Sequence, residues 1–326
     1  MNILGNELYK ANGALLETLL IDRSRPCEGD TPSHIVWGTD SYAHLGPQYG
    51  ENEPILAELI TGDKSNVIVP RALKSKREQQ FRSRDKAEVF TPSWVCNHQN
   101  NLIDEEWFGV EGVFNKELDK GWITSSDPVP FPAKNGKNWQ DYVTDIRLEI
   151  TCGEAPYLVS RYDAISGEIV PVRDRIGLLG RKLRVVSENT SSVEDWYCWT
   201  VRAYKSIYGY EWQGDNLLLA RQNALYTFFD YYQEYFSCLP SLGQAMEIAY
   251  IISWNLWQMD GIKGVIPNSC ELVNNGTDLF GEPVSNYCRG CSLPDEKDSI
   301  HNHIGIYCKI MDWEKNEAVR FVELIK

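Results

Sequence analysis

Side chains that bind metals are concentrated in one short part of this sequence. Residues 270–308 contain four cysteines and two histidines, and Cys288 and Cys291 form a Cys-x-x-Cys pair. The segment is rich in turn-forming residues and poor in large apolar ones, so a bound ion would organise it. Four soft ligands in a tetrahedron suit zinc. We therefore predict a structural zinc site with the ligands Cys270, Cys288, Cys291 and Cys308.

Two alternatives to this ligand set stay open. His301 or His303 could replace one of the cysteines, because an imidazole nitrogen also binds zinc. The cysteines could also be reduced thiols scattered in a loop, with no metal. The chain has nine cysteines, and this odd number favours reduced thiols or metal ligands over a disulfide framework.

An α/β pattern begins near Tyr142. Three strand-like segments, residues 145–150, 207–212 and 250–257, are separated by segments with apolar residues at helical spacing. A helix is also expected to begin at Tyr157, directly after the first strand. Short strands that alternate with helices predict a parallel sheet.

Each predicted strand is followed by residues that could contact a ligand. Gly153, in the turn after the first strand, allows close approach of the backbone. Glu211 ends the second strand, and its carboxylate could accept hydrogen bonds from both hydroxyls of a ribose. Asp260 follows the third strand and could accept a hydrogen bond from an adenine amino group. In an open α/β sheet, ligands bind beyond the carboxyl ends of the strands, so the three residues together predict a pocket for an adenosine-bearing ligand.

Each of these residues also has a simpler structural interpretation. Glycine is common after strands, Glu211 lies in a helix N-cap region, and Asp260-Gly261 is typical of a turn. Upstream, Phe90-Thr91-Pro92 precedes a helix-like run from Trp94 to Ile103. Thr91 could cap that helix and Pro92 fits its first turn, so capping alone would explain these two residues.

The order of four motifs resembles that of adenine-N6 DNA methyltransferases, and especially the modification subunits of restriction-modification systems. The motifs are Glu-Val-Phe-Thr-Pro, Leu-Glu-Ile-Thr-Cys-Gly-Glu, Ile-Tyr-Gly-Tyr-Glu-Trp and Asn-Leu-Trp-Gln-Met-Asp-Gly. The resemblance covers roughly residues 86–262. The resemblance implies an α/β fold with a Rossmann-like core that binds S-adenosylmethionine (SAM). We expect a mainly helical N-terminal region before that core and a small zinc-stapled β-hairpin after it.

The resemblance also implies roles for individual residues. Phe90, Thr91 and the glycine turn would hold the methionine part of SAM, Glu211 the ribose and Asp260 the adenine. A tryptophan near the pocket, such as Trp212, could stack on the adenine. The full set of cofactor-binding candidates is Phe90, Thr91, Thr151, Cys152, Gly153, Glu154, Glu211, Trp212 and Asp260.

The sequence departs from the family at the catalytic motif. The family carries an Asn/Asp-Pro-Pro-aromatic motif, which binds the target amino group and stacks on the flipped base. That motif does not occur here, and the nearest substitute is Asp312-Trp313 after a strand-like run. Asp312 could instead begin a hairpin turn. The protein could therefore methylate DNA with an atypical site, act with a separate catalytic or specificity subunit, or be a noncatalytic module that binds SAM or DNA.

The net charge of the chain bears on whether it binds nucleic acid. The chain has 326 residues, 43% of them hydrophobic, and a net charge of −14. The acidity argues against a general nucleic-acid coating protein. Residues 71–86 are an exception, with seven Lys or Arg against two acidic residues. This segment is either a solvated surface or a contact for DNA phosphates.

We expect four regions along the chain. These are a mainly helical region with the Phe-Thr-Pro segment (1–110), a connecting loop (111–140), a Rossmann-like SAM-binding core (141–269), and a Cys/His-rich insertion with a β-hairpin (270–326). No run approaches the roughly 18 apolar residues of a membrane span, and the first residues do not resemble a signal peptide. We therefore expect a cytoplasmic protein.

Overall fold

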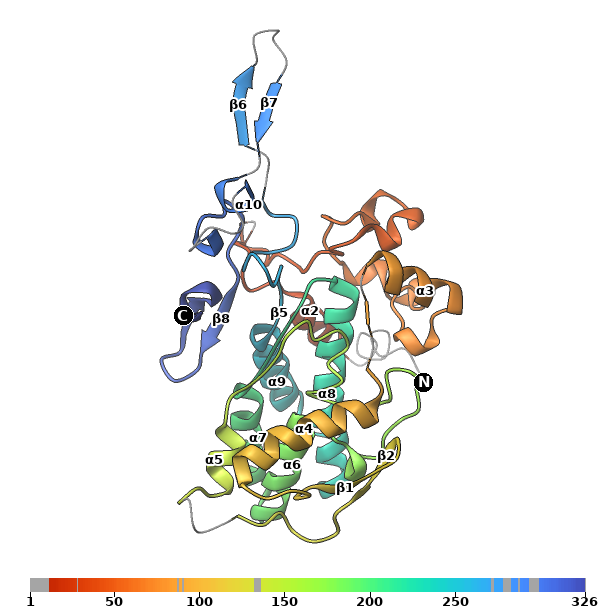
Figure 1. Ribbon diagram of the computed structural model, residues 1–326, viewed down its shortest axis with the longest axis vertical. Coiled ribbons are helices and arrows are strands. Elements are labelled where there is room, and N and C mark those ends of the chain that lie inside the picture. The colour runs from red at the N-terminus through yellow and green to blue at the C-terminus, as the bar shows by residue number, and fades with distance from the viewer. Residues whose placement is uncertain are drawn as a thin grey trace.

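The computed structural model describes residues 12–27, 29–86, 88–89, 91–131, 136–270, 273–277, 283–286, 288–292 and 299–325. It is a mixed α/β structure around a small parallel sheet (Figure 1). The sheet has three strands, β3 (Arg147–Glu149), β4 (Ile207–Glu211) and β5 (Leu256–Gln258), in the order β3-β4-β5. Both neighbouring pairs are parallel. The predicted parallel sheet is therefore confirmed.

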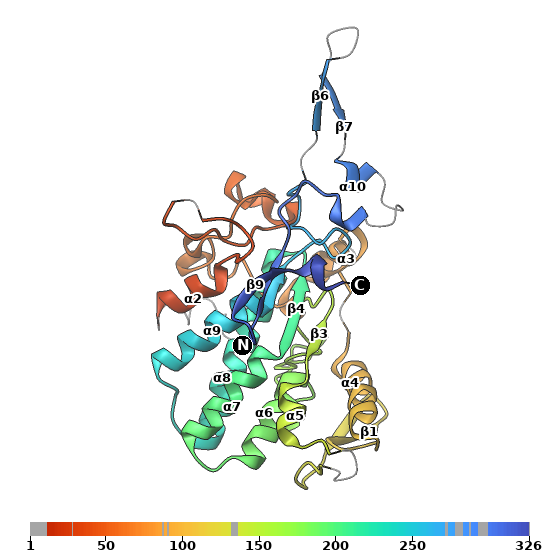
Figure 2. The same ribbon diagram turned by 90° about the vertical axis from the view of Figure 1, so that its left-hand side faces the viewer.

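Four helices lie side by side next to this sheet in both views (Figures 1 and 2). They are α6 (Leu178–Asn189), α7 (Val193–Lys205), α8 (Gly214–Phe236) and α9 (Leu242–Asn255). α7 and α9 begin at serines whose side chains accept backbone N–H groups of the first turn. α8 is buried on nearly all sides, so it forms the centre of the hydrophobic core.

The N-terminal part of the chain packs on the same core. α2 (Gly13–Leu20) contributes its buried leucines to a cluster that extends as far as Leu256. α3 (Lys76–Asp85) and α4 (Ser93–Phe108) follow, and α4 confirms the helix predicted after Trp94. The remaining turns are short 3-10 helices, namely η1 (Asp40–Leu45), η2 (Pro47–Tyr49), η3 (Ala57–Leu59), η4 (Gly62–Lys64), η5 (Arg71–Leu73), η7 (Val172–Asp174), η8 (Ser299–His301) and η9 (Phe321–Leu324).

Three local predictions are wrong. The connection 111–140 contains an antiparallel hairpin, β1 (Asn115–Leu118) and β2 (Gly121–Thr124), before α5 (Trp139–Thr144). No helix begins at Tyr157, because Ser160 has a φ angle of 46°, which an α-helix does not tolerate. Most of the third predicted strand belongs to α9. β5 is therefore only three residues long.

The C-terminal part forms two antiparallel hairpins around a short helix. β6 (Val273–Thr277) pairs with β7 (Pro283–Asn286), and this hairpin extends away from the rest of the described chain (Figure 2). α10 (Arg289–Ser292) follows it. β8 (Lys309–Asp312) and β9 (Glu317–Arg320) form the predicted terminal hairpin, which packs against Tyr210 and Trp257 of the sheet. No helix in the described ranges has the length and apolarity needed to cross a bilayer.

Candidate functional site

A cavity of about 900 Å³ lies beyond the carboxyl ends of β3, β4 and β5. We call it the strand-end cavity. Gly153 follows β3 with a φ of 54°, a left-handed conformation that glycine adopts without strain. Residues from all three strand ends meet at this place, so the topology brings distant parts of the sequence into one site. The predicted cofactor residues that line the cavity are Thr151, Gly153, Glu211, Trp212 and Asp260.

Glu211 joins the first two strand ends. Its carboxylate accepts the backbone N–H of Gly153 at 2.9 Å and that of Gln213 at 3.0 Å. Burial raises the pKa of Glu211 to about 7, although these two N–H groups oppose the shift. A carboxylate has about four acceptor positions, so Glu211 keeps acceptor capacity for a ligand in the cavity.

Asp260 and Trp212 form the side of the cavity next to β5. One oxygen of Asp260 accepts the backbone N–H groups of Ile262 and Lys263 at 3.0 and 3.2 Å, and the other lies 3.3 Å from the Lys263 ammonium. The turn role considered for Asp260 is therefore present, while its side chain also lines the cavity. The indole N–H of Trp212 donates to the Gly38 carbonyl at 2.7 Å, which fixes its ring.

Among the described residues, Thr91, Cys152 and Glu154 do not line the cavity. Cys152 is buried against Gly209. Glu154 accepts the backbone N–H of Arg71 and the hydroxyl of Tyr162, so it anchors a loop. The side chain of Thr91 does not cap α4. Phe90 lies outside the described residues.

The N-terminus of α4 is satisfied by a distant residue. Pro92 occupies the N-cap position and makes no side-chain cap. Asp163 instead accepts the backbone N–H of Ser93 at 2.8 Å. The predicted Thr91 cap is therefore wrong, because a long-range carboxylate reaches the first helical N–H group instead.

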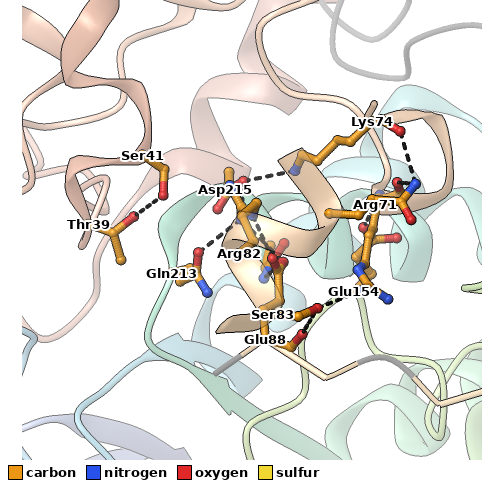
Figure 3. A network of polar contacts seen from close by, with 12 residues as sticks. Thr39, Ser41, Arg71, Lys74, Arg82, Ser83, Glu88, Glu154, Gln213 and Asp215 are labelled. Carbon is orange, nitrogen blue, oxygen red and sulfur yellow. Dashed lines mark hydrogen bonds and ion pairs between the residues drawn. The ribbon is translucent and has the colours of Figure 1, made fainter. Parts of the chain in front are cut away.

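α3 and the residues after it form the wall opposite the strand ends. Arg82 is buried, and its guanidinium contacts Glu88, Gln213 and Asp215 (Figure 3). Lys74 lies 3.2 Å from the same Asp215 carboxylate. Burial alone would raise the pKa of Asp215, but the charges of Arg82 and Lys74 hold it well below its usual value. This ionised network attaches α3 to the start of α8.

A second site lies at the base of the β6–β7 hairpin. The ligand atoms of Cys270, Cys288, Cys291 and His303 all lie within 4.8 Å of one another. The Cys288 sulfur is 3.9 Å from that of Cys270, and the three sulfurs are 3.5 to 3.7 Å from Nδ1 of His303. A tetrahedral zinc site requires sulfur–sulfur separations of about 3.8 Å and sulfur–nitrogen separations of about 3.5 Å. This Cys3His cluster could therefore hold a zinc ion.

The cluster corrects the predicted ligand set at one position. Cys308 is buried beside Tyr210 and Trp257, and its thiol donates to the Gln258 carbonyl at 3.2 Å. Its backbone N–H bonds to the Gly264 carbonyl, which fixes it under the sheet and away from the cluster. His303 takes the fourth position, while His301 is exposed in η8.

Asp312 and Trp313, the catalytic candidates, are not brought to the strand-end cavity. Asp312 accepts the backbone N–H groups of Glu314 and Lys315 at 3.1 Å, so it supports the hairpin turn. Trp313 donates to the Asn255 side chain at 2.8 Å. Both residues line a different cavity of about 670 Å³, between the terminal hairpin and β3.

Two sites are thus defined by geometry, the strand-end cavity and the Cys3His cluster. No family model, curated protein or solved structure matches the chain. The buried Arg82 network was not foreseen, because two of its partners, Gln213 and Asp215, lie more than a hundred residues from Arg82 in the sequence. The one signal in the sequence was the excess of positive charge in residues 71–86.

Proposed function

We propose that this protein binds SAM in the strand-end cavity and is an adenine-N6 DNA methyltransferase-like protein of a restriction-modification or related system. One observation carries the proposal. Gly153, Glu211 and Asp260 follow three neighbouring parallel strands and line one cavity. Their order along the chain is the order in which the resembling family contacts methionine, ribose and adenine. The Rossmann-like character of the core is part of this proposal.

The chemistry of the cavity supports an adenosyl ligand. Its volume lies within the range of about 300 to 1,000 Å³ that is usual for small-molecule sites. Glu211 offers carboxylate oxygens to ribose hydroxyls, and Trp212 offers an aromatic face to a base. Glu88 and Lys86 also line the cavity, where they pair with Arg82 and Asp40, so charges of both signs stand on its wall near the expected place of the amino acid part of SAM.

The residues of the chain would contribute mainly positioning. SAM supplies an activated methyl group, and transfer to an amine depends on holding the amine in line with it. The turn at Gly153 is fixed by its hydrogen bond to Glu211, so the first and second strand ends cannot separate freely. The zinc site would be structural, since the chain supplies all four ligands and leaves no open position.

Calorimetry with SAM tests the proposal. The wild-type protein should bind one equivalent, and Glu211→Ala and Asp260→Ala should weaken binding at least tenfold. Asp312→Ala is the matched control, because it removes a carboxylate that does not line the cavity. The absence of SAM binding to the wild-type protein would rule out the proposal.

A second candidate function is that of a noncatalytic or split-methyltransferase subunit, which binds SAM or DNA and acts with a separate catalytic chain. One edge of the sheet favours it. Within the described residues β3 pairs only with β4. Leu148 in this strand is 45% exposed, and Ile146 and Ile150 on either side of the strand are 70% and 64% exposed. A strand from another chain can add to such an edge.

Methyl transfer separates the two candidates. If the protein binds SAM and transfers labelled methyl groups to DNA on its own, the split-subunit candidate is excluded. If it binds SAM but transfers methyl groups only after addition of a chain with the Asn/Asp-Pro-Pro-aromatic motif, the second candidate is correct. Transfer that is lost in Asp312→Ala would identify an atypical catalytic site.

A further inference from the structure

The outer face of α3 forms a positively charged hollow of about 930 Å³. Its cationic lining residues are Arg71, Lys76, Arg77 and Arg84, and no carboxylate lines it. The whole chain carries a net charge of −14, so this concentration of cations is a local exception. A hollow lined by one sign of charge attracts ligands of the opposite sign.

Several cations of this segment already have partners within the protein. Lys74 and Arg82 are buried against Asp215, Arg84 pairs with Asp85, and Lys86 pairs with Asp40. Lys76 and Arg77 differ from them. Both are exposed, and neither pairs with a carboxylate within the described ranges. They stand in the first turn of α3, where cations do not stabilise the helix dipole.

An exposed aromatic ring stands among these cations. Phe81 is 45% exposed and lines the same hollow. Residues three or four positions apart share one face of a helix, so Arg77, Phe81 and Arg84 are neighbours on that face. Surfaces that bind single-stranded nucleic acid combine aromatic rings, which stack on bases, with cations that follow the phosphates.

The hollow is held beside the strand-end cavity. Arg84 lines both of them. Arg82, on the opposite side of α3, joins the helix to Asp215 and Gln213 at the start of α8 (Figure 3). A strand bound along α3 would therefore reach the rim of the strand-end cavity without movement of the helix.

We propose that the outer face of α3 binds the sugar-phosphate backbone of DNA through Lys76 and Arg77, with an unpaired base stacked on Phe81. The inference rests on the proposed function for the choice of DNA as the nucleic acid. In this proposal α3 is the segment that holds DNA beside the strand-end cavity. An acidic peptide would match the cations but gains nothing from stacking on Phe81, so DNA fits the observations better.

Fluorescence anisotropy with a labelled single-stranded oligonucleotide and the matching duplex tests this surface. Lys76→Glu/Arg77→Glu should weaken binding at least tenfold and reduce the slope of log K against log salt by about 1.4 for the single strand. Phe81→Ala should weaken single-strand binding about fivefold or more and leave the salt slope unchanged. Lys116→Glu/Lys120→Glu on the β1–β2 hairpin has the same change in net charge and should bind DNA as the wild type does.

The outcomes separate this inference from the proposed function. SAM binding measured by calorimetry should be unchanged in Lys76→Glu/Arg77→Glu, while Glu211→Ala should keep DNA binding. The α3 surface is excluded if its charge reversal leaves DNA binding intact, or if the control pair weakens it equally. Displacement of the oligonucleotide by polyglutamate at equal charge concentration would also overturn the proposal, because it would show a site for any polyanion.

Discussion

Arg82 holds the α3 wall of the strand-end cavity. Its guanidinium lies 2.8 Å from the Asp215 carboxylate and also pairs with Glu88. Burying these charges is costly, and the pairing offsets that cost only while every partner is present. Loss of the guanidinium would leave two buried carboxylates with too few positive charges.

We expect Arg82→Met to lower the free energy of unfolding by roughly 3 to 5 kcal/mol, because it leaves Glu88 and Asp215 poorly compensated. The matched control is Arg84→Met, two positions further along the helix. The Arg84 side chain is 82% exposed and that of Arg82 only 1%. Denaturant unfolding should therefore show a large loss for the first variant and little change for the second. Equal losses would contradict the importance of the network.

Glu211 gives the strand-end cavity a dependence on pH. Burial raises its pKa to about 7, and the nearby Asp215 and Glu88 contribute to the rise. Ribose hydroxyls donate best to an ionised carboxylate. A ligand that favours ionised Glu211 must therefore bind more tightly as pH rises through the pKa of the free protein.

Adenosine is a suitable probe, because it lacks the titratable amino acid part of SAM. Its affinity should be about tenfold weaker at pH 6 than at pH 8, since one proton must leave Glu211 on binding. Glu211→Gln should bind more weakly and show no such trend, whereas Asp260→Ala should keep it. A flat profile in the wild-type protein would show that Glu211 does not titrate on binding.

At the scale of elements, the fourth side chain of the Cys3His cluster is His303 and not Cys308. Both residues come shortly before β8 in the sequence, but only His303 lies with Cys270, Cys288 and Cys291. We expect wild-type protein and Cys308→Ala to contain about one equivalent of zinc by elemental analysis, and His303→Ala to contain much less. Zinc lost from Cys308→Ala but kept in His303→Ala would reverse this assignment.

Strong local signals explain which elements were predicted correctly. α6, α7 and α8 have helical spacing of apolar residues or clear caps, and the terminal hairpin has a polar turn between two β-rich runs. The end of α9 was mistaken for a strand. Ile251 and Ile252 in this part of the helix are buried in the same core as α2, α8 and Leu256 of the sheet, and periodicity alone does not distinguish a buried helix from a buried strand.

The site could be predicted from the sequence only for residues whose place follows from the order of the strands. Glu211 ends β4, and Gly153 and Asp260 follow the ends of β3 and β5, so a parallel sheet brings the three residues to one edge. Glu154 follows Gly153 directly, yet it points toward the Arg71 loop. Nothing local indicates that direction. The choice between His303 and Cys308 likewise depends on tertiary packing around the sheet.

At the scale of the whole molecule, the segment that carries His303 of the Cys3His cluster supports the third strand end. Val265 forms β-bridges with both Asp260 and Tyr307. The backbone N–H of Ile266 bonds to the Ile306 carbonyl at 2.9 Å. The turn that carries Asp260 is therefore held by the segment that contains His303, so the two sites are mechanically connected.

Removal of zinc should consequently weaken SAM binding by roughly fivefold or more, through a less ordered Asp260 turn. The comparison uses calorimetry on the zinc-loaded protein and on protein shown by elemental analysis to be metal-free. In Asp260→Ala the removal of zinc should lower SAM affinity less, because this variant already lacks the proposed contact between Asp260 and SAM. Equal SAM affinity with and without zinc would show that the sites are independent.

The central claim is that three strand ends bind one adenosyl group together. Hydrogen–deuterium exchange with and without SAM tests it most directly. We predict slower exchange in peptides covering residues 150–155, 209–214 and 258–264 at the same time, and no change in the terminal hairpin at 309–320. Exchange that slows only in the terminal hairpin, or at none of the three strand ends, would contradict the account.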